Sequence, residues 1–256
     1  MTPCDGRVGA ALADAAPASS IESMRLLLTG STGYIGSAVL DELLRSGHEV
    51  VAVVRSEASA EAAAARGAHP VVGELADATW FAGVLAEVDG AVHLAAPAEG
   101  AEALNAAVVD AAVAALSGTG KPFVLTSGIW EFGAGELDDE RPVDPPALVA
   151  WRVPIEDRLL AADVEATVLA PAVVHGRGRG LLGVIAGGPR RGDGALTLVG
   201  DGEQHWSWVH VDDLARLYRL VVEHGGGLGR LIGADGSPTT VRAVAEAVAG
   251  EAGVAP

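Results

Sequence analysis

A glycine-spaced turn near the start of the chain constrains its fold more than any other segment. Residues 29–36 read TGSTGYIG and directly follow the apolar run 26–28. Apolar residues at helical spacing then predict a helix that ends at Gly47, and a second strand is predicted over 49–54. A strand, a glycine turn, a helix and a second strand within about thirty residues are the parts of a dinucleotide-binding unit.

Each glycine of the turn has a separate structural use. Gly30 allows the tight turn, Gly33 lets the backbone approach a pyrophosphate, and Gly36 lets the helix pack closely on the strand. The phosphates are expected at the N-terminus of the helix, where unpaired N–H groups and the helix dipole favour negative charge. The predicted cofactor-binding residues of this segment are Thr29, Gly30, Ser31, Thr32, Gly33, Tyr34, Ile35 and Gly36.

The following part of the chain alternates strands with helices. Strands are predicted over 69–72, 90–94, 123–126 and 166–169, with helical segments between them. This alternation predicts an α/β fold of the Rossmann type, in which a doubly wound parallel sheet carries helices on both faces. Such sheets bind ligands at the carboxyl ends of their strands, so the residues that follow each strand are the candidates for a site.

Composition suggests where the domain begins. Residues 1–23 are rich in Ala, Ser and Pro and are predicted to be a disordered extension, with Met24 as an alternative start of the chain. Residues 24–256 are expected to form one domain. Its C-terminal part resembles a shortened form of the substrate region of a known family, which implies a small, reduced substrate region made of segments at about 175–208 and 233–256. Because this region is short, the substrate site is expected to be open or to be completed by a second copy in a homodimer.

Charge and cysteine content exclude several classes of protein. The formal net charge of −17 makes nucleic acid and anionic membrane surfaces poor partners, and its simplest explanation is solubility. Cys4 is the only cysteine, so neither an intrachain disulfide nor a cysteine-rich metal site is expected, and no metal is predicted. No apolar run reaches the length of a membrane span. We expect a cytoplasmic protein whose Ala-, Gly- and Arg-rich composition is typical of a GC-rich bacterial genome.

The spacing Gly-x-x-Gly-x-x-Gly after Thr29, taken with the pattern over about 24–249, resembles the extended short-chain dehydrogenase/reductase family in its epimerase/dehydratase-like branch. The resemblance implies an NAD(P) cofactor, with Asp77 at the adenine. It also implies that small residues after the fourth strand lie against the cofactor; these are Leu94, Ala95 and Ala96. Asp77 directly precedes a predicted helix, so an N-cap role is the alternative.

The end of the second strand predicts which dinucleotide is preferred. An acidic residue there would hydrogen-bond the ribose hydroxyls of NAD, whereas Arg55 can pair with the 2′-phosphate of NADP. We therefore expect NADP in preference to NAD. The alternative is an ordinary exposed arginine at a strand end.

Ser127 follows the fifth predicted strand, and the resemblance implies that it hydrogen-bonds the reacting oxygen of the substrate. The family's proton donor, a Tyr with a Lys four residues later, is absent, because the chain has two Tyr and one Lys in no such arrangement. Trp151 stands at the Tyr position and Ile155 at the Lys position. Indole has no accessible acidic proton and isoleucine cannot hold a ribose, so carbonyl reduction through that pair is excluded.

Few acids or bases remain to replace this pair. Pro171 begins a Pro-x-x-x-His-Gly turn that resembles the family's Pro-x-x-x-Tyr-Gly turn beside the nicotinamide and the substrate. His175 is therefore a candidate proton carrier, with a structural role as the alternative. Glu156 falls in the first turn of a helix that Pro154 is expected to start, where the dipole favours a carboxylate, so it receives no catalytic role. The basic loop 177–180 either receives an anionic substrate group or is only a mobile loop.

Aromatic side chains are the candidates for the wall of the substrate pocket. Trp130 and Trp151 either line this pocket or belong to the core. His205 and Trp206 lie in the stretch 199–213, which resembles a family segment that crosses the substrate cleft.

These features predict an NADP-dependent oxidoreductase of an atypical extended short-chain type that acts on a small-molecule carbonyl or alcohol. Ser127 polarises the substrate oxygen in this hypothesis, and His175 or water supplies the proton. Two alternatives stay open. One is a regulator or scaffold that binds NADP without turnover, and the other is an isomerase, lyase or cyclase that uses the same pocket without net redox change.

Overall fold

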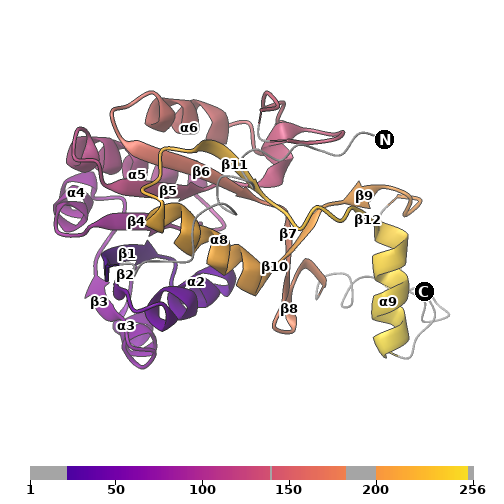
Figure 1. The fold of residues 1–256 in the computed structure, drawn as a ribbon, viewed down its shortest axis with the longest axis horizontal. Coiled ribbons are helices and arrows are strands. Elements are labelled where there is room, and N and C mark those ends of the chain that lie inside the picture. The colour runs from indigo at the N-terminus through magenta and orange to yellow at the C-terminus, as the bar shows by residue number, and fades with distance from the viewer. Residues whose placement is uncertain (1–21, 139, 183–199, 253–256) are drawn as a thin grey trace.

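A seven-stranded parallel sheet forms the centre of the protein (Figure 1). The structure is a computed structural model that describes residues 22–138, 140–182 and 200–252. The strands of the sheet are β1 Arg25–Thr29, β2 Glu49–Val54, β3 His69–Val72, β4 Gly90–His93, β5 Pro122–Thr126, β6 Glu165–Pro171 and β11 Gly229–Gly233. They lie in the order β11-β6-β5-β4-β1-β2-β3, so the chain reverses direction across the sheet between β1 and β4. The predicted Rossmann-type fold is confirmed.

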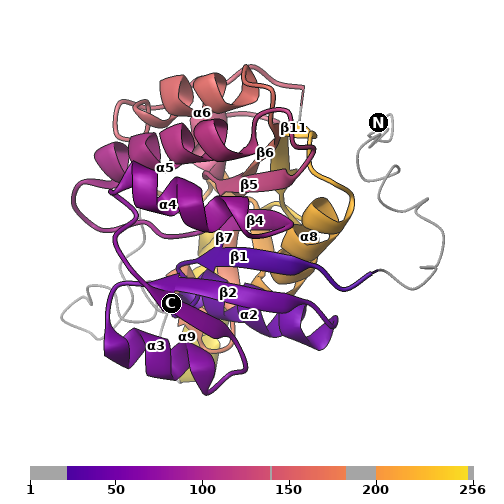
Figure 2. The same ribbon diagram turned by 90° about the vertical axis from the view of Figure 1, so that its left-hand side faces the viewer.

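Helices cover both faces of the sheet, as Figures 1 and 2 show. They are α2 Tyr34–Arg45, α3 Glu57–Ala64, α4 Ala78–Ala86, α5 Ala101–Leu116, α6 Arg152–Leu160 and α8 Val211–Glu223, with the 3-10 helix η1 Ile129–Phe132 after β5. Helices α2 and α8 pack on one face, and α4, α5 and α6 pack on the other. Along β1, Leu26 and Leu28 pack in the core on the side of α2 and α8, and Leu27 packs in the core on the side of α4, α5 and α6. Burial on both faces explains why the strands are apolar without alternation.

Beyond the carboxyl end of β6 the chain builds a smaller region, which Figure 1 shows on one side of the sheet. Strand β7 lies between β10 and β8, and β9 pairs with β12, which leads into α9. The bounds are β7 Val173–Gly176, β8 Arg179–Gly180, β9 His205–Trp206, β10 Trp208–His210, β12 Thr239–Thr240 and α9 Val241–Ala252. Strands of two to four residues contain too few alternations for the sequence pattern to predict them.

Two elements differ from the sequence prediction. Strand β11 was not predicted, because its two central apolar residues are flanked by glycines that indicate a turn. Helix α6 begins at Arg152, two residues before the predicted start at Pro154. Pro154 still lies in the first turn, where its missing N–H removes no helical hydrogen bond. Of the predicted N-terminal extension, residues 1–21 lie outside the described residues. None of the helices in the described part has the length and hydropathy that crossing a membrane requires.

Helix α2 lies almost in contact with the turn that precedes it. A Cβ atom added at Gly36 would stand 2.0 Å from the carbonyl oxygen of Gly30, so no side chain fits there. Gly30 itself has a φ of +70°, and a Cβ at this position would come within 2.8 Å of the Leu94 carbonyl carbon. The two glycines therefore allow the turn to fit between α2 and the end of β4.

We expect Gly36→Ala to lower the free energy of unfolding by roughly 2–3 kcal/mol, because the added methyl forces α2 away from the turn. Gly83→Ala is the matched control, since an added Cβ at this exposed position of α4 meets no atom within 4 Å. The control is expected to raise the free energy of unfolding by about 0.5–1 kcal/mol. Urea unfolding measures both changes, and equal stability of Gly36→Ala and the unmodified protein would contradict the close packing.

Candidate functional site

A cavity of about 710 Å³ lies at the carboxyl ends of β1, β2, β3 and β4. Its walls come from the residues that follow these four strands and from the first turns of α5. The lining residues are Gly30, Ser31, Thr32, Gly33, Val53, Val54, Arg55, Ser59, Gly73, Glu74, Leu75, Ala76, Ala95, Ala96, Pro97, Glu99, Gly100, Ala103, Leu104 and Ala107. This place, where the strand order reverses between β1 and β4, is where doubly wound sheets bind nucleotides. We call it the first cavity.

The glycine turn supplies the first cavity with unpaired hydrogen-bond donors. No side chain caps the N-terminus of α2, and its first turn contains no acidic residue. The hydroxyl of Ser31 is buried and has no hydrogen-bond partner within the described residues. Free helix N–H groups, the dipole of α2 and an unsatisfied hydroxyl together suit a phosphate group. These residues fit the pyrophosphate of a dinucleotide.

Thr29 has a structural part in the first cavity. Its Oγ1 accepts hydrogen bonds from the backbone N–H groups of Leu94 and Ala95 at 3.0 and 3.2 Å. It also lies 2.8 Å from Nδ1 of His93, which is fully buried. Burial, and secondarily the positive charge of Arg152, lower the pKa of His93 to about 4, so its imidazole is neutral. Thr29 and His93 therefore hold the end of β4 against β1 without adding charge.

Arg55 and Asp77 were both predicted to bind the cofactor, and the structure places them differently. Arg55 lines the first cavity, and its guanidinium has no carboxylate or other hydrogen-bond partner in the part of the chain that the structure describes. Asp77 caps α4, because its Oδ1 accepts a hydrogen bond from the Trp80 N–H at 3.0 Å. Ala76, and not Asp77, is among the lining residues. The N-cap alternative for Asp77 is observed, and its contact with adenine stays a prediction.

A second, largely apolar cavity of about 380 Å³ has Tyr34 in its wall, the residue directly after Gly33 of the first cavity. Its walls come from the turn after β5, the start of α6, and β7 with the residues around it. The lining residues are Tyr34, Gly128, Ile129, Trp130, Val149, Arg152, Pro171, Ala172, Val173, Val174, Gly180 and Leu181. Trp130, predicted to bind the substrate, thus lies in one place with Tyr34 and Pro171, which were predicted to bind the cofactor. We call this place the second cavity.

Ser127, next to the second cavity through Gly128, belongs to a buried polar cluster. Its Oγ lies 2.8 Å from Oε2 of Glu131, a carboxyl on η1 with no exposed surface. Glu156 on α6 is also buried, and Arg230 on β11 approaches its Oε2 at 3.4 Å. Oε1 of Glu131 has no hydrogen-bond donor within the described residues. The cluster thus contains two carboxyl groups and a single guanidinium.

Glu131 is held in its protonated form by these surroundings. Burial first, and then the hydrogen bond and negative charge of Glu156, raise the pKa of Glu131 to about 8. The hydrogen bond to Ser127 and the charge of Arg230 act in the opposite direction but do not outweigh burial. A proton on Glu131 also satisfies its otherwise unpartnered oxygen by bonding the two carboxyl groups to each other.

Sequence reasoning did not assign this acid pair. Glu131 lies between Trp130 and Phe132, and a carboxylate within an apolar segment was the only available signal. Glu156 was interpreted as an ordinary residue of a helical first turn, whereas the structure buries it beside Glu131 and Arg230. Arg152, which lines the second cavity, received no role either.

Besides Thr29, Ile35, Gly36, Asp77, Leu94 and Ser127, four predicted residues lie outside the walls of both cavities. His175 contacts the rings of His210 and Trp208, with centroid separations of 5.3 and 6.1 Å. Trp151 is half-buried against the core, and the Arg152 guanidinium stacks on its ring at 4.6 Å. His205 and Trp206 form β9 and pair with β12. The roles predicted for these four residues stay predictions. The described residues contain no group of three or more side chains suited to a metal ion.

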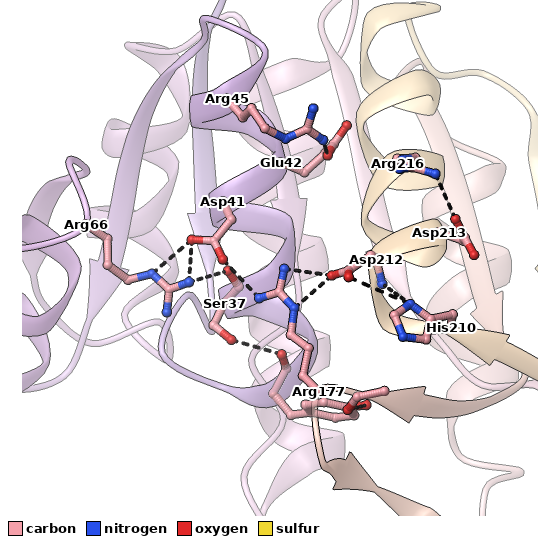
Figure 3. A network of polar contacts seen from close by, with 12 residues as sticks. Ser37, Asp41, Glu42, Arg45, Arg66, Arg177, His210, Asp212, Asp213 and Arg216 are labelled. Carbon is pink, nitrogen blue, oxygen red and sulfur yellow. Dashed lines mark hydrogen bonds and ion pairs between the residues drawn. The ribbon is translucent and has the colours of Figure 1, made fainter.

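The basic loop 177–180 is joined to the helices by ion pairs (Figure 3). Arg177 lies between Asp41 of α2 and Asp212 of α8, at 2.9 and 2.6 Å. Arg66 contacts the same Asp41 from the other side. Because its charge is already matched, Arg177 is a link between elements rather than the receiver of an anionic substrate group.

Comparison with known proteins agrees with this geometry. Residues 30–195 match the family model described as NAD(P)H-binding, and residues 160–231 match the NAD dependent epimerase/dehydratase family. An uncharacterised protein of Schizosaccharomyces pombe is 31% identical over 226 residues, which cover 84% of this chain and 77% of that protein. The UDP-glucose 4-epimerase of Mycolicibacterium smegmatis is 29% identical over 261 residues, which cover 90% of this chain and 83% of that enzyme.

A solved structure shows the same fold. The dTDP-glucose 4,6-dehydratase of Streptomyces venezuelae, crystallised with NAD, superposes with a TM-score of 0.74 at 23% identity. The superposition covers 90% of this chain and 82% of that enzyme. Since the NAD(P)H-binding family model spans more than half of the sequence, the chain belongs to that NAD(P)H-binding family, and its residues 160–231 also match the NAD dependent epimerase/dehydratase family.

Proposed function

We propose that this protein is an NADP-dependent oxidoreductase that acts on a small-molecule carbonyl or alcohol without the family's Tyr-x-x-x-Lys pair. One observation carries the proposal. The consecutive residues Gly33 and Tyr34 line a cavity large enough for a dinucleotide and a smaller apolar cavity, respectively, and the residue after Ser127 lines the smaller one. Pockets of this kind, mostly apolar with a few placed polar groups, are typical of small-molecule sites.

The preference for NADP is supported by the free guanidinium at the end of β2. The 2′-phosphate of NADP is a dianion that pairs well with arginine, and Arg55 has no competing carboxylate within the described residues. Ser31, the unpaired N–H groups of α2 and the small residues Ala95 and Ala96 would hold the pyrophosphate and the rest of the dinucleotide. When bound, the nicotinamide supplies hydride transfer.

We also propose that Glu131 supplies the proton through Ser127, in place of the missing Tyr. A serine hydroxyl that donates to a carboxylate has no hydrogen left for a substrate. When the proton of Glu131 moves from the contact with Glu156 to the oxygen that faces Ser127, the direction reverses, so that Glu131 donates to Ser127 Oγ and Ser127 donates to the carbonyl oxygen. As the carbonyl carbon is reduced, its oxygen takes the Ser127 proton, Ser127 takes the Glu131 proton, and solvent later restores the acid.

A nucleotide-bound regulator without turnover is the second candidate function, and the absence of the Tyr-x-x-x-Lys pair favours it. The two candidates differ in one measurement. Oxidation of NADPH, followed at the absorbance of the reduced nicotinamide with a panel of small ketones and aldehydes, is expected of the oxidoreductase. Tight dinucleotide binding without oxidation by any carbonyl would favour the regulator.

We expect Arg55→Met to weaken NADPH binding by roughly 10–100-fold, the effect of losing a charge-assisted contact with phosphate. NADH binding is expected to change little, because NADH lacks the 2′-phosphate. Arg216→Met is the control, since this arginine pairs with Asp213 on the exposed side of α8. Titration of the unmodified protein and both variants with each dinucleotide, followed by nucleotide fluorescence, measures the six affinities. Tighter binding of NADH than NADPH by the unmodified protein would overturn the NADP preference, and binding of neither would overturn the function.

The protonation of Glu131 predicts how stability depends on pH. Between about pH 5 and pH 8 the unfolded chain has lost the Glu131 proton while the folded protein retains it, so raising the pH through this window removes stability. Glu131→Gln keeps the hydrogen bond to Ser127 but cannot ionise, and is expected to flatten this loss. Urea unfolding at intervals across the window compares it with Glu61→Gln, an exposed control on α3. The same pH slope in all three proteins would contradict a protonated Glu131.

A further inference from the structure

One charged side chain stands in the wall of an otherwise uncharged cavity. Arg152, the first residue of α6, is the only acidic or basic residue among the described residues that line the second cavity. The remaining lining is mostly aliphatic, aromatic or glycine, and Tyr34 already donates its hydroxyl to the Gly176 carbonyl at 2.9 Å. Although the chain has a net charge of −17, none of the described residues that line this cavity beside Arg152 is acidic.

The guanidinium of Arg152 has no ion-pair or hydrogen-bond partner within the described residues. It stacks on the face of the Trp151 ring, with 4.6 Å between Cζ and the ring centroid. Other half-buried arginines of the protein behave differently: Arg219 pairs with two carboxylates, and Arg230 does the same. A partly buried guanidinium loses part of its hydration, and without hydrogen bonds to the protein this free-energy cost is not offset. A bound anion would offset it.

The charge of Arg152 also acts on a residue close to the first cavity. It acts on the fully buried His93, which ends β4 and precedes the residues that line the first cavity. Gly128, the neighbour of Ser127, lines the second cavity together with Arg152. An anionic group held by Arg152 would therefore lie beside the proposed proton relay and beside the cofactor.

We propose that the second cavity binds an apolar carbonyl compound that carries one carboxylate, with Arg152 holding the carboxylate and the aliphatic and aromatic walls holding the remainder. This substrate class deepens the proposed function and rests on it: an oxo acid is reduced to the hydroxy acid as NADPH is oxidised and one proton is taken up. A carboxylate suits a single guanidinium, which binds it with two parallel hydrogen bonds. A phosphate dianion needs further donors, and the described lining offers no other cation.

Phenylpyruvate and phenylacetone test this proposal, because they differ only in a carboxylate that replaces a methyl group. Binding is measured by quenching of tryptophan fluorescence in the presence of NADP, without turnover. We expect phenylpyruvate to bind the unmodified protein at least tenfold more tightly than phenylacetone. Arg152→Met is expected to remove this difference by weakening phenylpyruvate alone, and Arg152→Lys to restore part of it.

Arg158→Met is the matched control, since Arg158 lies on the same helix but pairs with Asp110 at the surface, at 3.1 Å. It is expected to leave both affinities unchanged. Equal affinity of the unmodified protein for the two compounds, or an unchanged preference in a folded Arg152→Met protein, would overturn the carboxylate site. The dinucleotide titrations separate the two proposals. If the unmodified protein does not bind NADPH, the oxidoreductase proposal is overturned. A preference for phenylpyruvate that depends on Arg152 would still support the anion site.

Discussion

The close approach of α2 to the turn after β1 is the contact on which the nucleotide cavity depends. With Gly36 lying against the carbonyl of Gly30, the first N–H groups of α2 are brought to the end of the strand, where side chains would otherwise fill the space. The same turn also touches the end of β4 through Gly30 and Thr29. A single packing arrangement thus sets the floor of the first cavity and joins the two halves of the sheet.

The side chains at the start of α6 differ from those that the family resemblance implies. Where the resemblance implies a phenol and an ammonium group, this chain has the indole of Trp151 and Ile155, which is buried in the core. Polar groups instead lie one residue away from these positions, as Arg152 and Glu156. Together with Glu131, these residues place two carboxyl groups and a guanidinium in this region. The chemistry of a protein depends on such site residues and not on its fold alone.

The central sheet was largely predictable, because β1 to β6 are apolar runs bounded by glycines or helical segments, and the turn 29–36 has a spacing that few other structures require. The acid pair was not predictable. Glu131 and Glu156 come from η1 and α6, and only the packing of α6 beside β6 and β11 brings them together with Arg230. Strand β11 was missed for the related reason that its glycines conceal an edge strand, which β6 stabilises by pairing along its whole length.

The ion pairs of Arg177 have a mechanical consequence. This residue joins the β7–β8 hairpin to α2 through Asp41 and to α8 through Asp212, while Tyr34 at the start of α2 donates a hydrogen bond to the Gly176 carbonyl of the same hairpin. The hairpin is therefore joined to α2 by an ion pair and a hydrogen bond. Moving the hairpin, whose Val173, Val174 and Gly180 line the second cavity, would break these contacts with the helix that follows the glycine turn.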